Sequence, residues 1–300
     1  MSRIAPERPV IRMTIGESPK LERDTLAGEE PLELRVGGRS FAVTMRTPGA
    51  DFDLAAGFLV SEGFITRSEQ LAAMRYCAGG RGGVNQYNLL DLTLADDVAP
   101  PDESLARAFF TTSSCGLCGK ASIDAVRTRS AFKVNDDPLR VTADMLVSLP
   151  GRLRAAQKVF EKTGGLHAAA LFSGETGELL VLREDVGRHN AVDKVIGWAL
   201  REGRLPLRGT ILLVSGRASF ELVQKAVMAG IPMLCAVSAP SSLAVDLAKE
   251  SNMALVGFLR DPSMVVYAGA ERVGEALDKV SQSEHQWRTS SSLFDQVALQ

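Results

Sequence analysis

Short apolar runs alternate with amphipathic stretches between residues 211 and 259, and this pattern constrains the fold more than any other feature of the sequence. The run Ile211-Leu212-Leu213-Val214 is apolar throughout, which is typical of a strand covered on both faces. The pattern predicts, in order, a strand at 211–214, a helix at 220–229, a strand at 233–237, a helix at 243–249 and a strand at 254–259. Strands joined by such short helices form parallel sheets with right-handed crossovers. Ligands of such sheets bind at the carboxyl ends of the strands.

The rest of the chain divides around this core. A hairpin at 166–182 and a helix at 191–200 precede it, whereas the region before residue 139 predicts a hairpin around Gly37-Gly38 and a helix that begins at Asp51. We expect a flexible tail at 1–27, an N-terminal α+β region at 28–138, an α/β domain at 139–275 and a second tail at 276–300.

Composition limits the partners and the compartment. The 300 residues carry 34 basic and 36 acidic side chains, a formal net charge of -2, so we expect neither nucleic acid nor a membrane surface as a partner. Four cysteines are too few for a disulfide-stapled secreted scaffold. The N-terminus has no apolar signal region, and no run is long enough to cross a bilayer. These features predict a cytoplasmic protein.

Cys115 and Cys118 carry the sharpest chemical signal. They form a CxxC pair before a predicted helix at 121–129, and the helix dipole together with Lys120 favours the thiolate form. A thiolate at this spacing suits metal ligation, disulfide exchange or persulfide carriage. The spacing alone does not choose among the three.

A metal site lacks further ligands. Cys77 and Cys235 stand alone, and neither His167 nor His189 is followed by the HxE pattern of a zinc deaminase. We therefore predict no metal.

Residues 183–194 combine acids, bases, an imidazole and an amide at a strand-to-helix turn. One interpretation is structural: Asn190 caps the helix, while Asp193 and Lys194 are solvated. The other is a cleft for a polyanionic nucleotide, in which Arg217, Lys194 and Arg260 pair with phosphates beside His189. The residues alone leave both open.

Several motifs occur in an order that resembles the FdhD family, whose members are sulfur-carrier accessory proteins of formate dehydrogenase. They are Met45-Arg46-Thr47-Pro48, Ser114-Cys115-Gly116-Leu117-Cys118-Gly119-Lys120, Gly165-Leu166-His167-Ala168-Ala169, the segment Glu184 to Lys194, Ser215-Gly216-Arg217, Ser238-Ala239-Pro240 and Gly257-Phe258-Leu259-Arg260. The likeness covers roughly residues 30 to 270.

The resemblance implies a fold and a function. The fold is an α/β, cytidine-deaminase-like three-layer core with a smaller N-terminal α+β region, and the protein is a homodimer. The function is to take sulfur from a cysteine desulfurase and to transfer it to the bis-molybdopterin guanine dinucleotide molybdenum cofactor of the formate dehydrogenase catalytic subunit. It makes the chain an accessory persulfide carrier of sulfurtransferase type rather than a multiple-turnover enzyme.

The resemblance also assigns site residues. Cys115 holds the persulfide and Cys118 assists it, while the segment after the last strand of the alternation binds the guanine nucleotide, for which GDP is a mimic. The expected cofactor-binding residues are Phe258, Leu259, Arg260, Asp261, Pro262 and Ser263, together with Arg217, His189 and Lys194 of the cleft. The alternatives are a dithiol oxidoreductase and a nucleotide-binding or metal-binding accessory protein without sulfur transfer.

Overall fold

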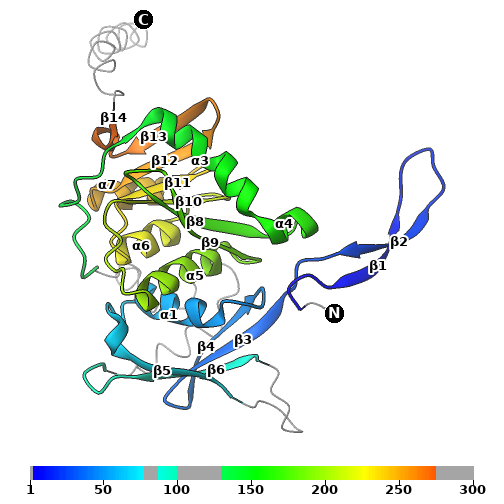
Figure 1. Cartoon of the computed structure of the whole chain (residues 1–300), viewed down its shortest axis with the longest axis horizontal. Coiled ribbons are helices and arrows are strands. Elements are labelled where there is room, and N and C mark those ends of the chain that lie inside the picture. The colour runs from blue at the N-terminus through cyan, green and yellow to red at the C-terminus, as the bar shows by residue number, and fades with distance from the viewer. Residues whose placement is uncertain (1–2, 78–86, 100–129, 275–300) are drawn as a thin grey trace, which may run out of the picture.

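The computed structural model describes residues 3–77, 87–99 and 130–274. In this part of the chain two sheets lie on either side of a helical layer, and a hairpin reaches away from the body (Figure 1). The CxxC motif and the strand and helix predicted around it lie outside the described residues, as does the segment 276–300.

The larger sheet has six strands in the order β13-β12-β11-β10-β8-β9. Its strands are β8 (His167–Ser173), β9 (Leu179–Asp185), β10 (Thr210–Val214), β11 (Met233–Ala236), β12 (Ala254–Arg260) and β13 (Ser263–Ala268). Strands β10, β11 and β12 are parallel, whereas β8 runs antiparallel to β10. The parallel alternation predicted from the sequence is confirmed, and β13 adds an antiparallel edge strand that was not predicted.

Helices cover both faces of this sheet. Leu212 and Val214 of β10 join a cluster of buried side chains with α5 (Arg188–Arg201), α6 (Phe220–Met228) and α7 (Ser242–Glu250). Ile211 and Leu213 of the same strand join a second cluster with α3 (Ala143–Ala156). Both alternating sets of side chains are therefore buried, which explains the unbroken apolar run of β10.

The N-terminal region forms the smaller sheet, in the order β4-β3-β6-β5. Its elements are β3 (Glu30–Val36), β4 (Arg39–Arg46), α1 (Asp51–Ser61), the 3-10 turn η1 (Ser68–Gln70), β5 (Leu71–Tyr76) and β6 (Leu89–Leu94). Helix α1 lies beside α5, and both lie between the two sheets (Figure 1). One buried cluster runs from Leu34 of β3 through α5 to Leu171 of β8, so the two regions share a core.

The contact between α1 and α5 depends on two glycines. A Cβ atom at Gly57 would lie 1.8 Å from the Asp193 carbonyl oxygen, and one at Gly197 would lie 1.8 Å from the Asp53 carbonyl oxygen. Only glycine permits this close approach of the two backbones.

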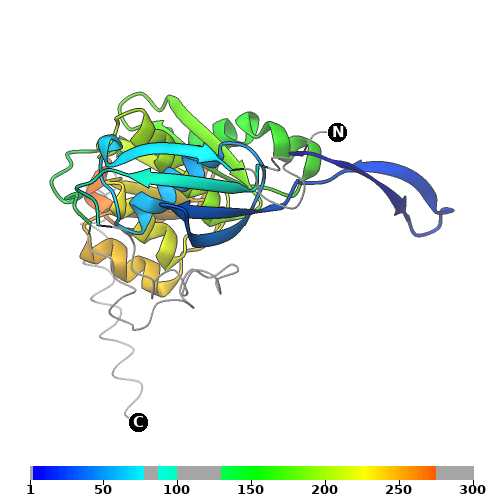
Figure 2. The ribbon, with the colours of Figure 1, turned by 90° about the horizontal axis from the view of Figure 1, so that it is seen from below.

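Residues 1–27 were predicted as a tail, but β1 (Glu7–Arg12) and β2 (Lys20–Thr25) form an antiparallel hairpin. The hairpin extends from the body in both views (Figures 1 and 2). Ile11 faces Leu21 across the strands, and Arg23 pairs with Glu7 at 2.9 Å. Prolines, a glycine and charged residues interrupt the apolar alternation between residues 7 and 25, which is why no strand was predicted there.

The remaining short elements complete the described chain. They are β7 (Val141–Thr142), α4 (Lys158–Thr163), η3 (Ala270–Arg272) and β14 (Val273–Gly274). Strand β7 pairs with β14 in parallel, which ties the start of the α/β region to the end of the described chain.

Candidate functional site

The carboxyl ends of β10, β11 and β12 meet at one side of the larger sheet. We call this surface the carboxyl edge and define it by residues 215–218, 238–241 and 258–263. The Ala218 amide donates to the Ala239 carbonyl at 3.2 Å, and the Phe258 amide donates to the Ser238 carbonyl at 3.1 Å. These bonds join the three segments into a continuous surface, as the parallel topology predicts.

Two arginines stand on this edge. Arg217 is exposed and makes no hydrogen bond or ion pair with any described residue, and Arg260 is exposed at the end of β12. Phe258 lies beside them with 37% of its surface exposed. Its φ of 49° places it in the left-handed region, which an aromatic residue adopts only at an energetic cost. An exposed ring and unpaired guanidinium groups suit a flat anionic ligand.

The turn that follows has a mixed character. Asp261 and Pro262 between β12 and β13 are exposed, as is Ser263 at the start of β13, whereas the side chain of Leu259 is fully buried. Leu259 belongs to the cluster beneath α3. It therefore supports the edge from inside, and its side chain does not reach the surface.

His189 and Glu221 form a polar pair next to the edge. The His189 Nε2 atom lies 3.9 Å from Glu221 Oε2 and 3.5 Å from the Ser219 hydroxyl oxygen. Burial of the Glu221 carboxyl raises its pKa, but the His189 ring and the Ser219 hydroxyl outweigh burial and lower the pKa to about 2. Glu221 is therefore an anion that orients the imidazole.

His167, at the start of β8, lies against Gly216 of the carboxyl edge. A Cβ atom at Gly216 would lie 3.4 Å from His167 Nδ1, so the glycine leaves room for the ring against the backbone. Burial lowers the pKa of His167, and the nearby Arg188 and His189 lower it further. The buried Arg188 Nε atom has no hydrogen-bond partner among the described residues.

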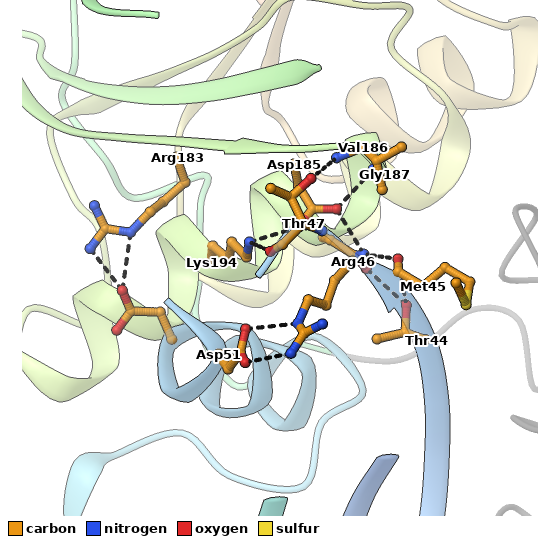
Figure 3. A network of polar contacts seen from close by, with 12 residues as sticks. Thr44, Met45, Arg46, Thr47, Asp51, Arg183, Asp185, Val186, Gly187 and Lys194 are labelled. Atoms are coloured by element: carbon orange, nitrogen blue, oxygen red, sulfur yellow. Dashed lines mark hydrogen bonds and ion pairs between the residues drawn. The ribbon is translucent and has the colours of Figure 1, made fainter. Parts of the chain in front are cut away.

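Lys194 lies in a buried network and not on the edge (Figure 3). Its side chain is 2% exposed, its Nζ atom lies 2.7 Å from Asp185 Oδ2, and it donates to the Thr47 carbonyl at 2.9 Å. Asp185 also accepts from the Thr47 amide at 3.1 Å and from the Gly187 amide at 2.8 Å. Lys194 therefore fastens the N-terminal segment to the start of α5.

Asn190 and Asp193 also join segments that are distant in sequence through buried hydrogen bonds and ion pairs. The Asn190 side-chain amide donates to the Met45 carbonyl at 2.7 Å, and Gly187, not Asn190, is the N-cap of α5. Asp193 is buried between the Ser61 hydroxyl at 2.7 Å and the Lys225 Nζ atom at 2.8 Å. The expectations that Asn190 caps this helix and that Asp193 and Lys194 are solvated are both wrong, because these side chains bridge segments distant in sequence.

Arg46 anchors the other end of the network. Its side chain is fully buried and forms two hydrogen bonds with Asp51, at 3.0 and 2.9 Å (Figure 3). The Met-Arg-Thr-Pro motif therefore has a structural use in this chain. The described motif residues therefore fall into two groups: a buried polar network that joins the N-terminal region to α5, and the exposed carboxyl edge.

Sequence reasoning missed Glu221 as the partner of His189. The two residues are 32 positions apart and meet only because α5 and α6 begin at the same side of the sheet. The available signal was the position of Glu221 in the first turn of the helix after Ser215-Gly216-Arg217.

The described cysteines differ from a reactive pair. Cys235 is fully buried in β11 and burial raises its thiol pKa, while Cys77 is half-buried. Cys115 and Cys118 lie outside the described residues. Within residues 3–77, 87–99 and 130–274, no group of three or more His, Cys, Asp or Glu side chains could hold a metal ion. None of the helices in those ranges has the length and apolar character needed to cross a bilayer.

The fold and the edge together define an α/β protein with a three-layer core and an exposed edge that carries two arginines and an aromatic ring. The chain matches the FdhD/NarQ family over residues 27–274 and belongs to that family.

Its relatives cover nearly its whole length. It is 60% identical over 272 residues to the sulfur carrier protein FdhD of Mycolicibacterium paratuberculosis, covering 90% of this chain and 99% of that relative. It is 61% identical over 275 residues to the protein of the same name in Streptomyces avermitilis, covering 91% of this chain and 97% of that one. The crystal structure of a candidate formate dehydrogenase accessory protein from Desulfotalea psychrophila has a TM-score of 0.69 at 22% identity, covering 90% of this chain and 99% of that one. That likeness supports the fold.

Proposed function

We propose that this protein is a sulfur carrier that serves the assembly of a formate dehydrogenase. The observation that carries the proposal is the pair Cys115 and Cys118 in a chain 60% identical to a protein named sulfur carrier protein FdhD. A CxxC pair at a predicted helix start favours thiolates, and a thiolate is the nucleophile that sulfur transfer requires.

The loading step is a thiolate exchange at sulfur. The Cys115 thiolate attacks the terminal sulfur of a persulfide on a cysteine desulfurase, the sulfur–sulfur bond of the donor breaks, and the donor cysteine leaves as a thiolate. One sulfur atom moves with no change in the total number of electrons, so no other oxidant or reductant is needed. Cys118 assists loading or release.

The recipient is the molybdenum cofactor that carries bis-molybdopterin guanine dinucleotide, bound as cargo before it enters the catalytic subunit. The carboxyl edge supports this part of the proposal, because Arg217 and Arg260 are exposed cations and Phe258 is an exposed ring. Asp261, Pro262, Ser263 and His189 frame the same surface. The buried side chain of Leu259 supports this surface from inside, whereas Lys194 belongs to the buried network with Asp185 and Thr47.

The proposal includes a homodimer in the cytoplasm and a cytidine-deaminase-like core. The mixed sheet of β8 to β12, with helices on both faces, supports that architecture. No deaminase activity is proposed, because neither His167 nor His189 begins the His-x-Glu motif that such chemistry uses.

Mass spectrometry of the intact protein tests sulfur carriage. After incubation with a cysteine desulfurase and cysteine, we expect the mass of one added sulfur atom, and peptide mapping should place it on Cys115. The Cys115→Ser variant should gain none, whereas Cys235→Ser, which removes a buried thiol, should load normally.

A reversible disulfide between Cys115 and Cys118 with no added sulfur would instead favour a dithiol oxidoreductase. Nucleotide binding without any thiol modification would favour an accessory protein that does not transfer sulfur.

A further inference from the structure

The hairpin of β1 and β2 is a two-stranded sheet that stands away from the body of the protein (Figures 1 and 2). No third strand joins it among the residues that the structure describes. It precedes residues 27–274, the range that matches the FdhD/NarQ family, so the family match does not account for it. A two-stranded hairpin is only marginally stable in water, and a partner that extends the sheet would stabilise it.

Large apolar side chains are exposed near the tip of this hairpin. Ile11 of β1 and Leu21 of β2 face each other across the strands and are 67% and 79% exposed. Met13 and Ile15, in the connection between the two strands, are exposed as well. Single exposed apolar residues are common, but a group of them at the end of a protruding arm marks an interaction surface.

The hydrogen-bonding pattern shows which edge of the hairpin is open. The Leu26 amide donates to the Pro6 carbonyl at 2.9 Å. Hydrogen-bonded and non-hydrogen-bonded pairs alternate along antiparallel strands, so the amides and carbonyls of Leu21 and Arg23 point away from β1. Pro9, opposite Arg23, leaves the outer edge of β1 without a donor. The outer edge of β2 is therefore the one that can pair with a further strand.

This outer edge of β2 is complementary to itself. When two copies of β2 lie antiparallel about Leu21, the two leucines face each other and exchange backbone hydrogen bonds across a twofold axis. The same alignment places Lys20 of each copy opposite Glu22 of the other, in non-hydrogen-bonded pairs whose side chains lie close together. Alignments about Lys20, Glu22 or Arg23 would instead oppose like charges on the axis. The charges thus select the alignment about Leu21.

The charges within one hairpin favour the same arrangement. Lys20 lies directly opposite Arg12, a like charge, and Glu22 pairs with Arg12 diagonally. The contact of Lys20 with Glu17 at 3.0 Å is exposed on both sides and contributes little to stability. Glu22 of a second copy would supply the opposite charge on the free side of Lys20.

From these observations we infer that two copies of this chain join through the outer edges of β2, antiparallel about Leu21, into a four-stranded sheet. Ile11 and Leu21 of both copies then form one apolar row across that sheet. Leu21 lies towards the tip of an arm that extends from the body, so the pairing requires no contact between the two bodies (Figure 1). The contact is small, so the association is reversible and the hairpin still opens more readily than the core. The inference rests on the homodimer of the proposed function and specifies its surface, but it uses neither the cysteine pair nor the carboxyl edge.

Sedimentation velocity of the full chain over a range of protein concentrations tests the pairing. Lys20→Glu and Glu22→Lys each replace the opposed charges by like charges, so each should weaken self-association by about tenfold or more. An equimolar mixture of the two variants should form a heterodimer of parental strength, because every charge pair across the axis is then opposite in sign. Glu178→Lys is the matched control, since it makes the same change at an exposed residue of the body and should associate like the parent.

Three outcomes overturn the inference. A parent that stays monomeric at every concentration would leave the hairpin to a different protein, and variants that associate like the parent would place the homodimer on another surface. A mixture that stays monomeric would exclude the alignment about Leu21. Sulfur loading on Cys115, measured by mass spectrometry in each variant, tests the proposed function separately and should not change. Lost loading in a protein that still dimerises would count against sulfur carriage and not against the pairing.

Discussion

At the scale of single residues, charged side chains serve two different purposes in this protein. Arg217 is exposed on the carboxyl edge, whereas Arg46 and Lys194 are buried with carboxylate partners. The sequence places all three cations in polar motifs and gives no sign of this division, because burial depends on residues that are distant along the chain. Asp185, for example, meets the Thr47 amide across 138 positions.

Lys194→Met should destabilise the protein, because it leaves the buried Asp185 carboxylate without its cation. Breaking a buried pair on one side costs about 3–5 kcal/mol of unfolding free energy. Urea denaturation followed by circular dichroism measures the loss, and the exposed Lys249→Met change should stay within about 0.5 kcal/mol of the parent. Unchanged stability together with lost nucleotide binding would mean that Lys194 contacts the ligand directly.

Glu221 makes stability depend on pH in the acidic range. Its pKa is about 2 in the folded chain and about 4.3 when unfolded, so its contribution is complete above about pH 4.5 and disappears as pH falls towards 2. The side chain is partly solvated, so the effect is smaller than the full shift implies. Urea midpoints at pH 5 and pH 3 should differ less in Glu221→Gln than in the parent, whereas the exposed Glu178→Gln should keep the parental difference. An identical pH dependence in Glu221→Gln and the parent would contradict this role.

At the scale of elements, the packing of α1 against α5 joins the N-terminal region to the α/β core. The helices approach so closely that a Cβ atom added at Gly57 or Gly197 would lie 1.8 Å from a backbone oxygen of the opposite helix. Gly57 marks this contact in the sequence, but a glycine inside a helix alone does not say which helix it faces. The strands were easier to predict, since the apolar runs of β10 and β11 depend only on burial of both faces.

Gly57→Ala should cost about 3 kcal/mol or more of unfolding free energy, since the added methyl group would lie 1.8 Å from the Asp193 carbonyl oxygen and force the helices apart. The better helix propensity of alanine offsets only about 1 kcal/mol of this. Gly151→Ala in α3 is the control, because no atom lies within 4 Å of its added Cβ, and it should stabilise the protein slightly. Thermal and urea unfolding of the two variants should therefore shift in opposite directions. Shifts of the same sign would show that the α1–α5 contact is looser than described.

At the scale of the whole molecule, the sequence predicted the parallel core and the location of the carboxyl edge, because strand order and strand ends follow from local patterns. It did not predict the hairpin at 7–25, where the alternation is interrupted, nor the pairing of His189 with Glu221. The sequence also did not predict that the two regions share one hydrophobic core. Leu34 and Leu171 belong to one buried cluster although 137 positions separate them, and local periodicity carries no information about such contacts.

Hydrogen exchange followed by mass spectrometry should show this organisation directly. Because one core runs through both sheets, peptides from β3 and β10 should exchange with similar, high opening free energies. Peptides from β1 and β2 should exchange much faster, since a two-stranded hairpin with exposed side chains is only marginally stable. Gly57→Ala should lower the protection of β3 and β10 together and leave the hairpin unchanged. Loss of protection in β3 alone would show that the smaller sheet unfolds independently of the α/β core, in which case the α1–α5 contact joins two separately cooperative units.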